Sequence, residues 1–407
     1  MHMFEAVTIA GSDLNAGTVA EALIYYGRVD VAVGGGLLVN LTKSFGGENI
    51  VRAVDMGALR LVYERTHHVV VSISEPYRVH NFTGVSLAGS ADGKKVKSAQ
   101  DELEEMFQRN FGKSQQARLL ARDLSDRLHE RDFREEISKQ AILDVLDVKF
   151  MTQATAAWLS TMVPEYALPA DFKVETAETG SGFVFVTGLD FEEINKFYHR
   201  RVPVSHSSVD PAYLLAHVLT MRKEISYAAD GKSDVWLGPG ESSILQARVD
   251  ILANRISRSH SNINTFHDVE FEGRTFREAI DSGENTVSDL LTLLEEEETR
   301  KFKVWLASQP NDGLLIKEYD RAVFQKSGWT QRLPFKLGKI CTFAGLGVVI
   351  DAALGSAGLA TLVATSLSAG SDIVVGASDE FLLSKLGKGW KPNQFVEGPA
   401  KKFFEKK

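Results

Sequence analysis

An arginine and a histidine seven positions apart, Arg122 and His129, are the residues of this sequence best placed for catalysis. A histidine can act as a general acid or base near neutral pH, and an arginine can stabilise charge on a phosphate. Leucines at helical spacing, including Leu120 and Leu124, predict a helix over residues 115–130. A spacing of seven places both side chains on nearly one helix face, which suits metal-free phosphodiester cleavage.

This Arg-x6-His pattern resembles the motif of HEPN-class ribonucleases, in which four to six residues separate an arginine from a histidine on a helix. The resemblance implies RNA as the substrate, with His129 as general acid or base and Arg122 stabilising phosphate charge. Similar pairs occur at Arg201…His206 and Arg255…His260, so the pattern is loose. A solvent-facing helix surface is the alternative interpretation of Arg122 and His129.

The glycines Gly34–Gly36 are a second candidate site, because VDVAVGGGLLVNLTKS has the outline of a strand, a glycine turn and a helix. Backbone N–H groups at such a turn can bind an anion at the helix N-terminus. Leu37 and Thr42 stand where a P-loop requires glycines, and Val39 stands at the third glycine of the dinucleotide motif. The sequence names no ligand for this turn, and the alternative is a flexible turn after a buried strand.

Three other arrangements carry weaker signals. Asp144, Asp147 and Lys149 resemble half of a metal-dependent nuclease site, but their segment is predicted to end a helix. Serines flank a histidine at residues 205–208, which predicts a polar entry to the next helix, because sequence adjacency implies no hydrogen bond. No metal-binding motif is present, and we expect neither a metal nor a cofactor.

The most unusual segment is apolar and glycine-rich, and it runs from Cys341 to Ala377 with only two charges, Asp351 and Asp372. Its charge-free length suits a membrane helix, yet its many glycines, serines and threonines and the two aspartates disfavour deep insertion. A helical hairpin that turns at residues 355–358 fits better. Small residues four apart allow close helix packing. The segment is therefore a soluble core, a self-association element or a membrane-contacting element.

Basic residues flank this hairpin on both sides. Residues 325–339 and residues 380–407 each carry a net charge of +4, whereas the whole chain carries −8. Basic and aromatic flanks suit contact with anionic lipid head groups. The residues expected to make the interaction are Ala360, Ala364, Gly370, Lys388, Trp390 and Lys391.

The chain is expected to be cytoplasmic, with peripheral membrane contact if the hairpin docks on lipid. It has one cysteine, so an internal disulfide framework is excluded, and its acidic charge gives no overall footprint for nucleic acid. Its 407 residues, 44% of them hydrophobic, can bury an ample core.

The expected fold is α+β and predominantly helical. We expect an α/β module at residues 1–90, a mainly helical domain at 97–330 with a β-hairpin near 172–186, and the hydrophobic hairpin with its basic tail at 335–407. The leading hypothesis is a non-catalytic interaction protein whose C-terminal hairpin mediates homo-oligomerisation or membrane docking, as in a membrane-perturbing effector. The alternatives are the metal-independent ribonuclease and ligand binding at the glycine turn.

Overall fold

The computed structural model describes residues 5–11, 14–73, 78–86, 98–131, 133, 136–256, 264–267, 275–307, 339–342 and 393–405. Helices and strands are mixed along the chain, which confirms the expected α+β class in its coarse form. Almost all of the predicted hydrophobic hairpin, and the tail as far as residue 392, lie outside the described residues. Within the described ranges, no helix has the length and apolar character needed to cross a bilayer.

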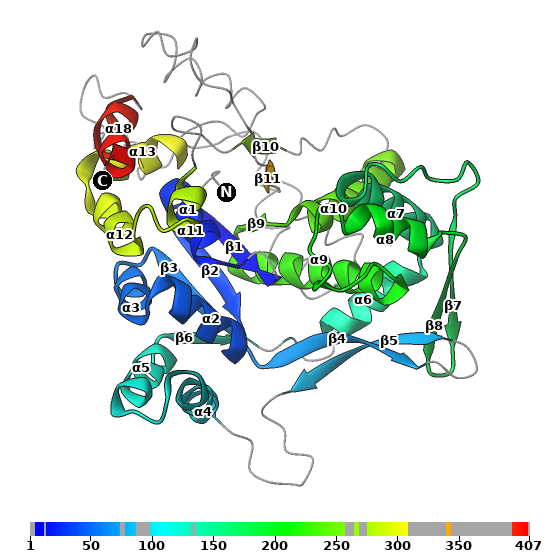
Figure 1. Cartoon of the computed structure of the whole chain (residues 1–407), viewed down its shortest axis with the longest axis horizontal. Coiled ribbons are helices and arrows are strands. Elements are labelled where there is room, and N and C mark those ends of the chain that lie inside the picture. The colour runs from blue at the N-terminus through cyan, green and yellow to red at the C-terminus, as the bar shows by residue number, and fades with distance from the viewer. Residues whose placement is uncertain are drawn as a thin grey trace.

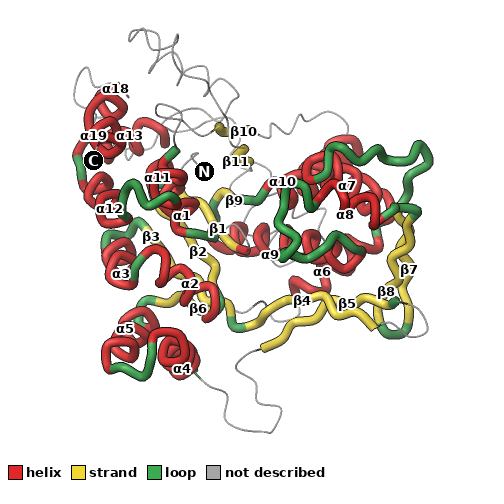
Figure 2. Tube along the Cα trace, viewed as in Figure 1, coloured by secondary structure: helices red, strands yellow, loops and turns green. Residues whose placement is uncertain are grey.

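Five strands form a fully parallel sheet in the order β6-β3-β2-β1-β9 (Figures 1 and 2). They are β1 (Ala6–Ala10), β2 (Arg28–Val33), β3 (Leu59–Glu64), β6 (Leu128–Arg131) and β9 (Asp234–Trp236). In the central register, Val7 of β1 lies between Val29 of β2 and Asp234 of β9. Because every pairing is parallel, the carboxyl ends of all five strands meet at one edge of the sheet.

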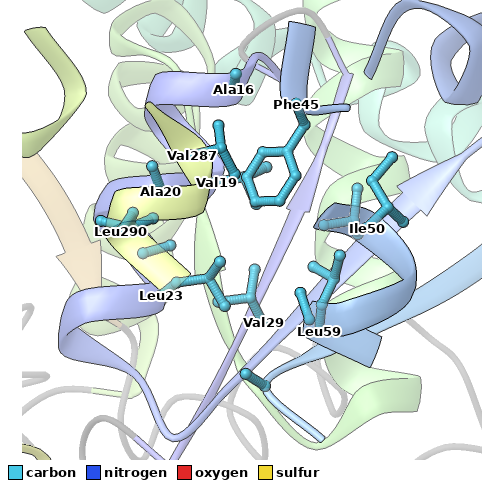
Figure 3. Close-up of a cluster of buried hydrophobic side chains, with 14 of the residues drawn as sticks. Ala16, Val19, Ala20, Leu23, Val29, Phe45, Ile50, Leu59, Val287 and Leu290 are labelled. Carbon is cyan, nitrogen blue, oxygen red and sulfur yellow. The ribbon is translucent and has the colours of Figure 1, made fainter. Parts of the chain in front are cut away.

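One face of this sheet is covered by helices from two separate parts of the chain, residues 16–55 and 276–295. They are α1 (Ala16–Tyr25), α2 (Gly35–Phe45), α3 (Gly47–Asp55), α11 (Phe276–Asp281) and α12 (Val287–Glu295). Figure 3 shows Val29 and Leu59 of the sheet lying close to Val19, Phe45 and Leu290, all of them at most 2% exposed. Strand residues alternate between the two faces of a sheet, so every second residue of β2 and β3 belongs to this core.

The other face of the parallel sheet carries polar residues beneath the long helix α9 (Pro211–Gly231). Asp30 is 1% exposed and accepts hydrogen bonds from Nε of Arg28 and Nε of Arg60, each at 2.8 Å. Arg28 also donates to the carbonyl oxygen of Gly231 at 3.2 Å. The buried carboxylate thus holds two arginines, and one of them ties the end of α9 to the sheet.

A second, antiparallel sheet has the order β4-β5-β8-β7. Its strands are β4 (Thr66–Ile73), β5 (Val79–Ser86), β7 (Val174–Thr179) and β8 (Gly182–Thr187). The β7–β8 pair is the predicted hairpin, and only Arg65 separates β4 from β3. One face of this sheet buries Phe82 and Phe183 in the core of the helical region.

The opposite face of the antiparallel sheet is exposed and apolar. Register pairing places β-branched residues of three strands on it, with 38–55% of each exposed: Val69, Val71, Ile73, Val85 and Val186. We call this surface the valine face. One face of an antiparallel sheet commonly faces water, and the residues on that face are usually polar.

A helical region lies beside the antiparallel sheet (Figure 1). It contains α6 (Glu136–Leu146), α7 (Val148–Met162), α8 (Phe191–Tyr198), α9 and α10 (Pro239–Ile256). Asp210 caps α9 by accepting from the Tyr213 N–H at 2.8 Å, and Pro211 occupies the first turn, which is the helix start that an Asp-Pro pair predicts. Two further helices, α4 (Ala99–Phe111) and α5 (Gln115–Ser125), pack against α2 and α3.

The last described residues return to the parallel-sheet region. They form α18 (Asn393–Phe395), η3 (Val396–Ala400) and α19 (Lys401–Glu405), beside α13 (Glu297–Ala307) and α12. The side chain of Asn285 donates to the carbonyl oxygen of Phe403 at 2.6 Å, and the rings of Phe302 and Phe395 stack at 4.3 Å. A small antiparallel ladder joins β10 (Asn264–His267) to β11 (Lys339–Thr342).

Two predicted helices are wrong in their extent. The helix expected over 115–130 ends at Ser125, and β6 follows because residues 128–131 pair with β3. Leucines at helical spacing after Thr286 also predict one helix over residues 286–308, but Glu296 divides it, because its extended backbone (ψ 138°) separates α12 from α13. The predicted domain boundaries stay predictions.

Candidate functional site

The candidate site lies where β2 runs into α2 at the carboxyl edge of the parallel sheet. Gly34 is the N-cap of α2, and its carbonyl oxygen accepts the first helical hydrogen bond from Leu38 at 3.0 Å. Because the N-cap is glycine, it has no side chain with which to cap this helix end. The N–H groups of the first turn have no acceptor within the helix, and the helix dipole makes this end partly positive. An uncapped helix end at this edge of an open α/β sheet is a typical place for an anionic ligand.

The glycines leave space that other side chains occupy. A Cβ on Gly34 would lie 2.5 Å from Cε1 and 2.7 Å from Nε2 of His67. A Cβ on Gly35 would clash with Sδ of Met106 and would lie 3.2 Å from the hydroxyl oxygen of Tyr63. Side chains from β3, β4 and α4 therefore converge directly on the first turn of α2. We call Gly34, Gly35, Tyr63, His67 and Glu102 the glycine-turn site.

Three buried polar atoms at this site lack a hydrogen-bond partner among the described residues: the hydroxyl of Tyr63, Nε2 of His67 and Oε2 of Glu102. Burial raises the pKa of Tyr63, and the nearby Glu102 carboxylate raises it further. The two groups thus face each other as a weak hydrogen-bonded pair, although no hydrogen bond of normal geometry joins them. Buried polar groups are nearly always paired, so a cluster of such atoms indicates a missing partner.

Local structure fixes each of these side chains. Tyr63 and His67 lie four residues apart across the single-residue junction between β3 and β4. Glu102 belongs to the first turn of α4, which a reciprocal capping box between Ser98 and Asp101 holds in place. Tyr63 is fully buried and Glu102 is 8% exposed, whereas Gly36 is exposed and opens the turn to solvent.

At the N-terminus of the neighbouring helix α1, side chains accept hydrogen bonds from the N–H groups of the first turn. Asn15 caps it by accepting from the Thr18 N–H at 2.8 Å. The Gly17 N–H donates to Oδ1 of Asp281 at 2.9 Å, so a carboxylate from α11 occupies the helix end. The N-terminus of α2 has no comparable capping side chain.

The predicted ribonuclease pair is not arranged as expected. Arg122 lies in α5, and its Nε donates to Oε1 of Glu104 at 2.7 Å. His129 lies in β6, so the two residues do not share a helix face. Asp144 and Asp147 both contact Arg248, at 3.2 Å and 3.0 Å, which gives them structural partners. Among the described residues, no group of three or more potential metal ligands gathers.

The residues predicted for interaction all lie outside the described part of the chain: Ala360, Ala364, Gly370, Lys388, Trp390 and Lys391. Their role in self-association or lipid contact stays a prediction. Sequence reasoning found Gly34–Gly36 but missed Tyr63, His67 and Glu102. The one available signal was the position of His67 between two strand-like stretches, residues 58–64 and 68–73, and nothing in the sequence joined it to the glycines.

Comparisons with known proteins return no relative. No family model matches the chain, no curated protein matches it, and no solved structure matches it.

Proposed function

We propose that this protein binds a small phosphorylated molecule that carries hydroxyl groups, such as a sugar phosphate or a nucleotide, at the glycine-turn site. The observation that carries the proposal is a cluster of three buried polar atoms that make no hydrogen bond of normal geometry, around a helix N-terminus whose N-cap is glycine. A ligand that bonds to all of them would remove an energetic penalty of about 1–3 kcal/mol for each unpaired group.

The phosphate would bind at the first turn of α2. The N–H groups of Gly35 and Gly36 belong to this turn, and the positive end of the helix dipole favours a negative charge there. His67 lies against Gly34 and would donate from Nε2 to a phosphate oxygen. Gly36 is exposed, so this part of the site is open to solvent.

Glu102 indicates which chemical group the rest of the ligand should carry. An ionised carboxylate only accepts hydrogen bonds, so its unpaired Oε2 requires a donor. A ligand hydroxyl is such a donor, and the Tyr63 hydroxyl beside Glu102 can bond to the same group. An acidic side chain near a helix-bound phosphate serves ribose hydroxyls in dinucleotide-binding folds by the same physics. The Met106 side chain covers Gly35 and must move aside for a ligand to reach it.

Titration calorimetry with ribose 5-phosphate, adenosine monophosphate and inorganic phosphate tests the proposal. We expect all three to bind, and the two hydroxylated ligands to bind more tightly than phosphate alone. Glu102→Gln should weaken the hydroxylated ligands about tenfold, which corresponds to about 1.4 kcal/mol, and should leave phosphate unchanged.

Glu104→Gln is the matched control, because Glu104 lies on the same helix and pairs with Arg122 instead. Gly35→Ala should abolish binding by crowding Met106 and Tyr63, whereas a Cβ on Gly36 meets only Cε of Met106 at 3.9 Å. The proposal is wrong if none of the ligands binds. It is also wrong if Glu102→Gln binds each ligand with the same affinity as Glu104→Gln does.

The functions expected from other segments remain proposals. Self-association or membrane docking by residues 340–377 concerns a segment almost wholly outside the described residues, and flotation with anionic liposomes tests it. RNA cleavage by Arg122 and His129 is tested by the activity of His129→Ala.

A further inference from the structure

An open depression lies beside α8, away from the glycine turn, with a volume of about 560 Å³. One wall is a single face of α8, formed by Glu192, Asn195, Lys196 and His199 at helical spacing. The facing wall is the chain entering α9, at residues 208–210. The depression therefore has His199 and the cationic Lys196 on one wall and Ser208 on the facing wall.

Ser208 and His199 are joined in this depression. The distance from Oγ of Ser208 to Nε2 of His199 is 3.2 Å, and Nδ1 of His199 is 3.3 Å from the carbonyl oxygen of Val202. A carbonyl oxygen can only accept, so Nδ1 carries the hydrogen in the neutral ring. Nε2 is then the bare acceptor, and the Ser208 hydroxyl donates to it. This is the tautomer that a serine nucleophile requires of its general base.

The surrounding contacts hold the pair in position. Asn195 donates to the Val209 carbonyl oxygen at 2.8 Å and accepts from the Val209 N–H at 2.7 Å. The next residue, Asp210, caps α9 and pairs with Arg78 at 2.7 Å. The backbone on the C-terminal side of Ser208 is thus fixed to α8 and to α9. Nearby, the rings of Tyr198 and His199 are in contact at 5.3 Å.

We infer that Ser208 and His199 hydrolyse small acyl esters in this depression. The Ser208 oxygen adds to the ester carbonyl carbon while Nε2 of His199 takes the hydroxyl proton. The bond to the leaving alcohol then breaks, and the imidazolium returns the proton to that alcohol, which leaves an acyl-serine. Water then adds to the acyl carbon and gives a proton to His199. The Ser208–acyl bond breaks, Ser208 regains the proton, and a carboxylic acid departs.

Two further residues of the depression suit this chemistry. Lys196 lies on the same face of α8, one turn before His199, and its charge would stabilise the oxyanion that forms on the carbonyl oxygen. Phe191 also lines the depression, is partly exposed and offers apolar surface for a short acyl group.

Labelling with a fluorophosphonate followed by peptide mass spectrometry tests the inference, with hydrolysis of p-nitrophenyl acetate measured in parallel. We expect the label on Ser208 and not on Ser205 or Ser207, which lie in the same exposed loop. Ser208→Ala and His199→Gln should each slow hydrolysis about 100-fold or more. The control variants Ser207→Ala and His206→Gln alter the adjacent residues and should stay within about twofold of the parent.

Thermal unfolding of each variant separates lost chemistry from lost folding. Ser208 is exposed, so Ser208→Ala should unfold at the parent temperature. The inference is overturned if the reagent modifies no serine, modifies all three equally, or still labels Ser208 at the parent rate in His199→Gln. Parent-level ester hydrolysis by Ser208→Ala also overturns it.

Discussion

Arg222 and Asp144 form an ion pair that is almost completely removed from water, with 3% and 1% of their side chains exposed. The Nε–Oδ2 distance is 2.8 Å, and Arg248 approaches the other carboxylate oxygen at 3.2 Å. Asp144 comes from α6, Arg222 from α9 and Arg248 from α10, so one carboxylate links three helices. The centre of the helical region is therefore held by charge as well as by apolar packing.

Asp144→Asn should destabilise the protein by about 3–5 kcal/mol, because it leaves the buried Arg222 without its counter-charge and leaves Arg248 with Asp147 alone. Urea unfolding measures the loss. The control is Glu165→Gln, which removes the partner of Arg201 in a pair whose side chains are 48% and 40% exposed. That change should alter stability by less than about 1 kcal/mol. Equal effects of the two substitutions would contradict the structural role of Asp144.

Stability should fall on acidification because of His80. This residue is 1% exposed, and its Nδ1 is 2.8 Å from Oγ of Ser72. Burial lowers the pKa of His80 below 6.5, the Arg78 charge lowers it further, and Asp210 opposes both effects. Between these two pKa values, His80 is therefore protonated in the unfolded chain and neutral in the folded protein. The contribution is fully present above about pH 6.5 and is lost as the pH falls from there towards the lower folded pKa.

His80→Gln should reduce this acid sensitivity, since glutamine can still bond to Ser72 and does not titrate. The measurement is the unfolding temperature of both proteins between about pH 7.5 and pH 5. A variant whose unfolding temperature falls as steeply as that of the parent would exclude His80 as the source.

Tyr63→Phe should leave the stability of the ligand-free protein unchanged or raise it by about 1 kcal/mol, because the deleted hydroxyl is buried and makes no hydrogen bond of normal geometry. Tyr198→Phe should lower stability by about 0.5–1.5 kcal/mol, since the Tyr198 hydroxyl is 2.9 Å from that of Tyr213. Chemical unfolding of both variants makes the comparison. A loss for Tyr63→Phe as large as that for Tyr198→Phe would show that Tyr63 has a structural partner.

The valine face should tolerate polar substitution. Val186→Thr changes a residue of β8 that is 55% exposed, so stability should shift by less than about 0.5 kcal/mol. Val174→Thr makes the same change on β7 at a fully buried position of the opposite face, and should cost about 1–3 kcal/mol by burying a hydroxyl. Similar losses for both variants would mean that the valine face is covered in solution.

Local patterns predicted the elements whose signals lie within a few residues. The turn at residues 180–181 predicted β7–β8, and Asp210 with Pro211 predicted the start of α9. Strand β6 was missed because its sequence, LHER, is short and polar, and its pairing with Leu61–Glu64 is a tertiary contact. Strand β9 has only three residues, and its place beside β1 depends on partners more than 200 residues away. The order of strands within a sheet cannot be predicted from local periodicity.

The candidate sites divide in the same way. The glycine turn was visible because glycines after a strand form a local pattern. Tyr63, His67 and Glu102 belong to three different elements, so their convergence required the fold. Ser208 was predicted only as part of a polar helix entry, because its partner is His199, nine positions earlier, and not the adjacent His206.

The parallel sheet is completed by late parts of the chain, and this sets the order in which it can form. The hydroxyls of Thr8 and Ser233 meet at 2.6 Å across 225 positions, and the start of α1 is filled by Asp281, 264 positions beyond Gly17. During synthesis, β1 must therefore wait for β9 and α11 to leave the ribosome. Fragments that end before residue 234 would keep one side of β1 unpaired, and an unpaired strand edge promotes aggregation. The strand encoded first, β1, is thus among the last to have both of its edges paired.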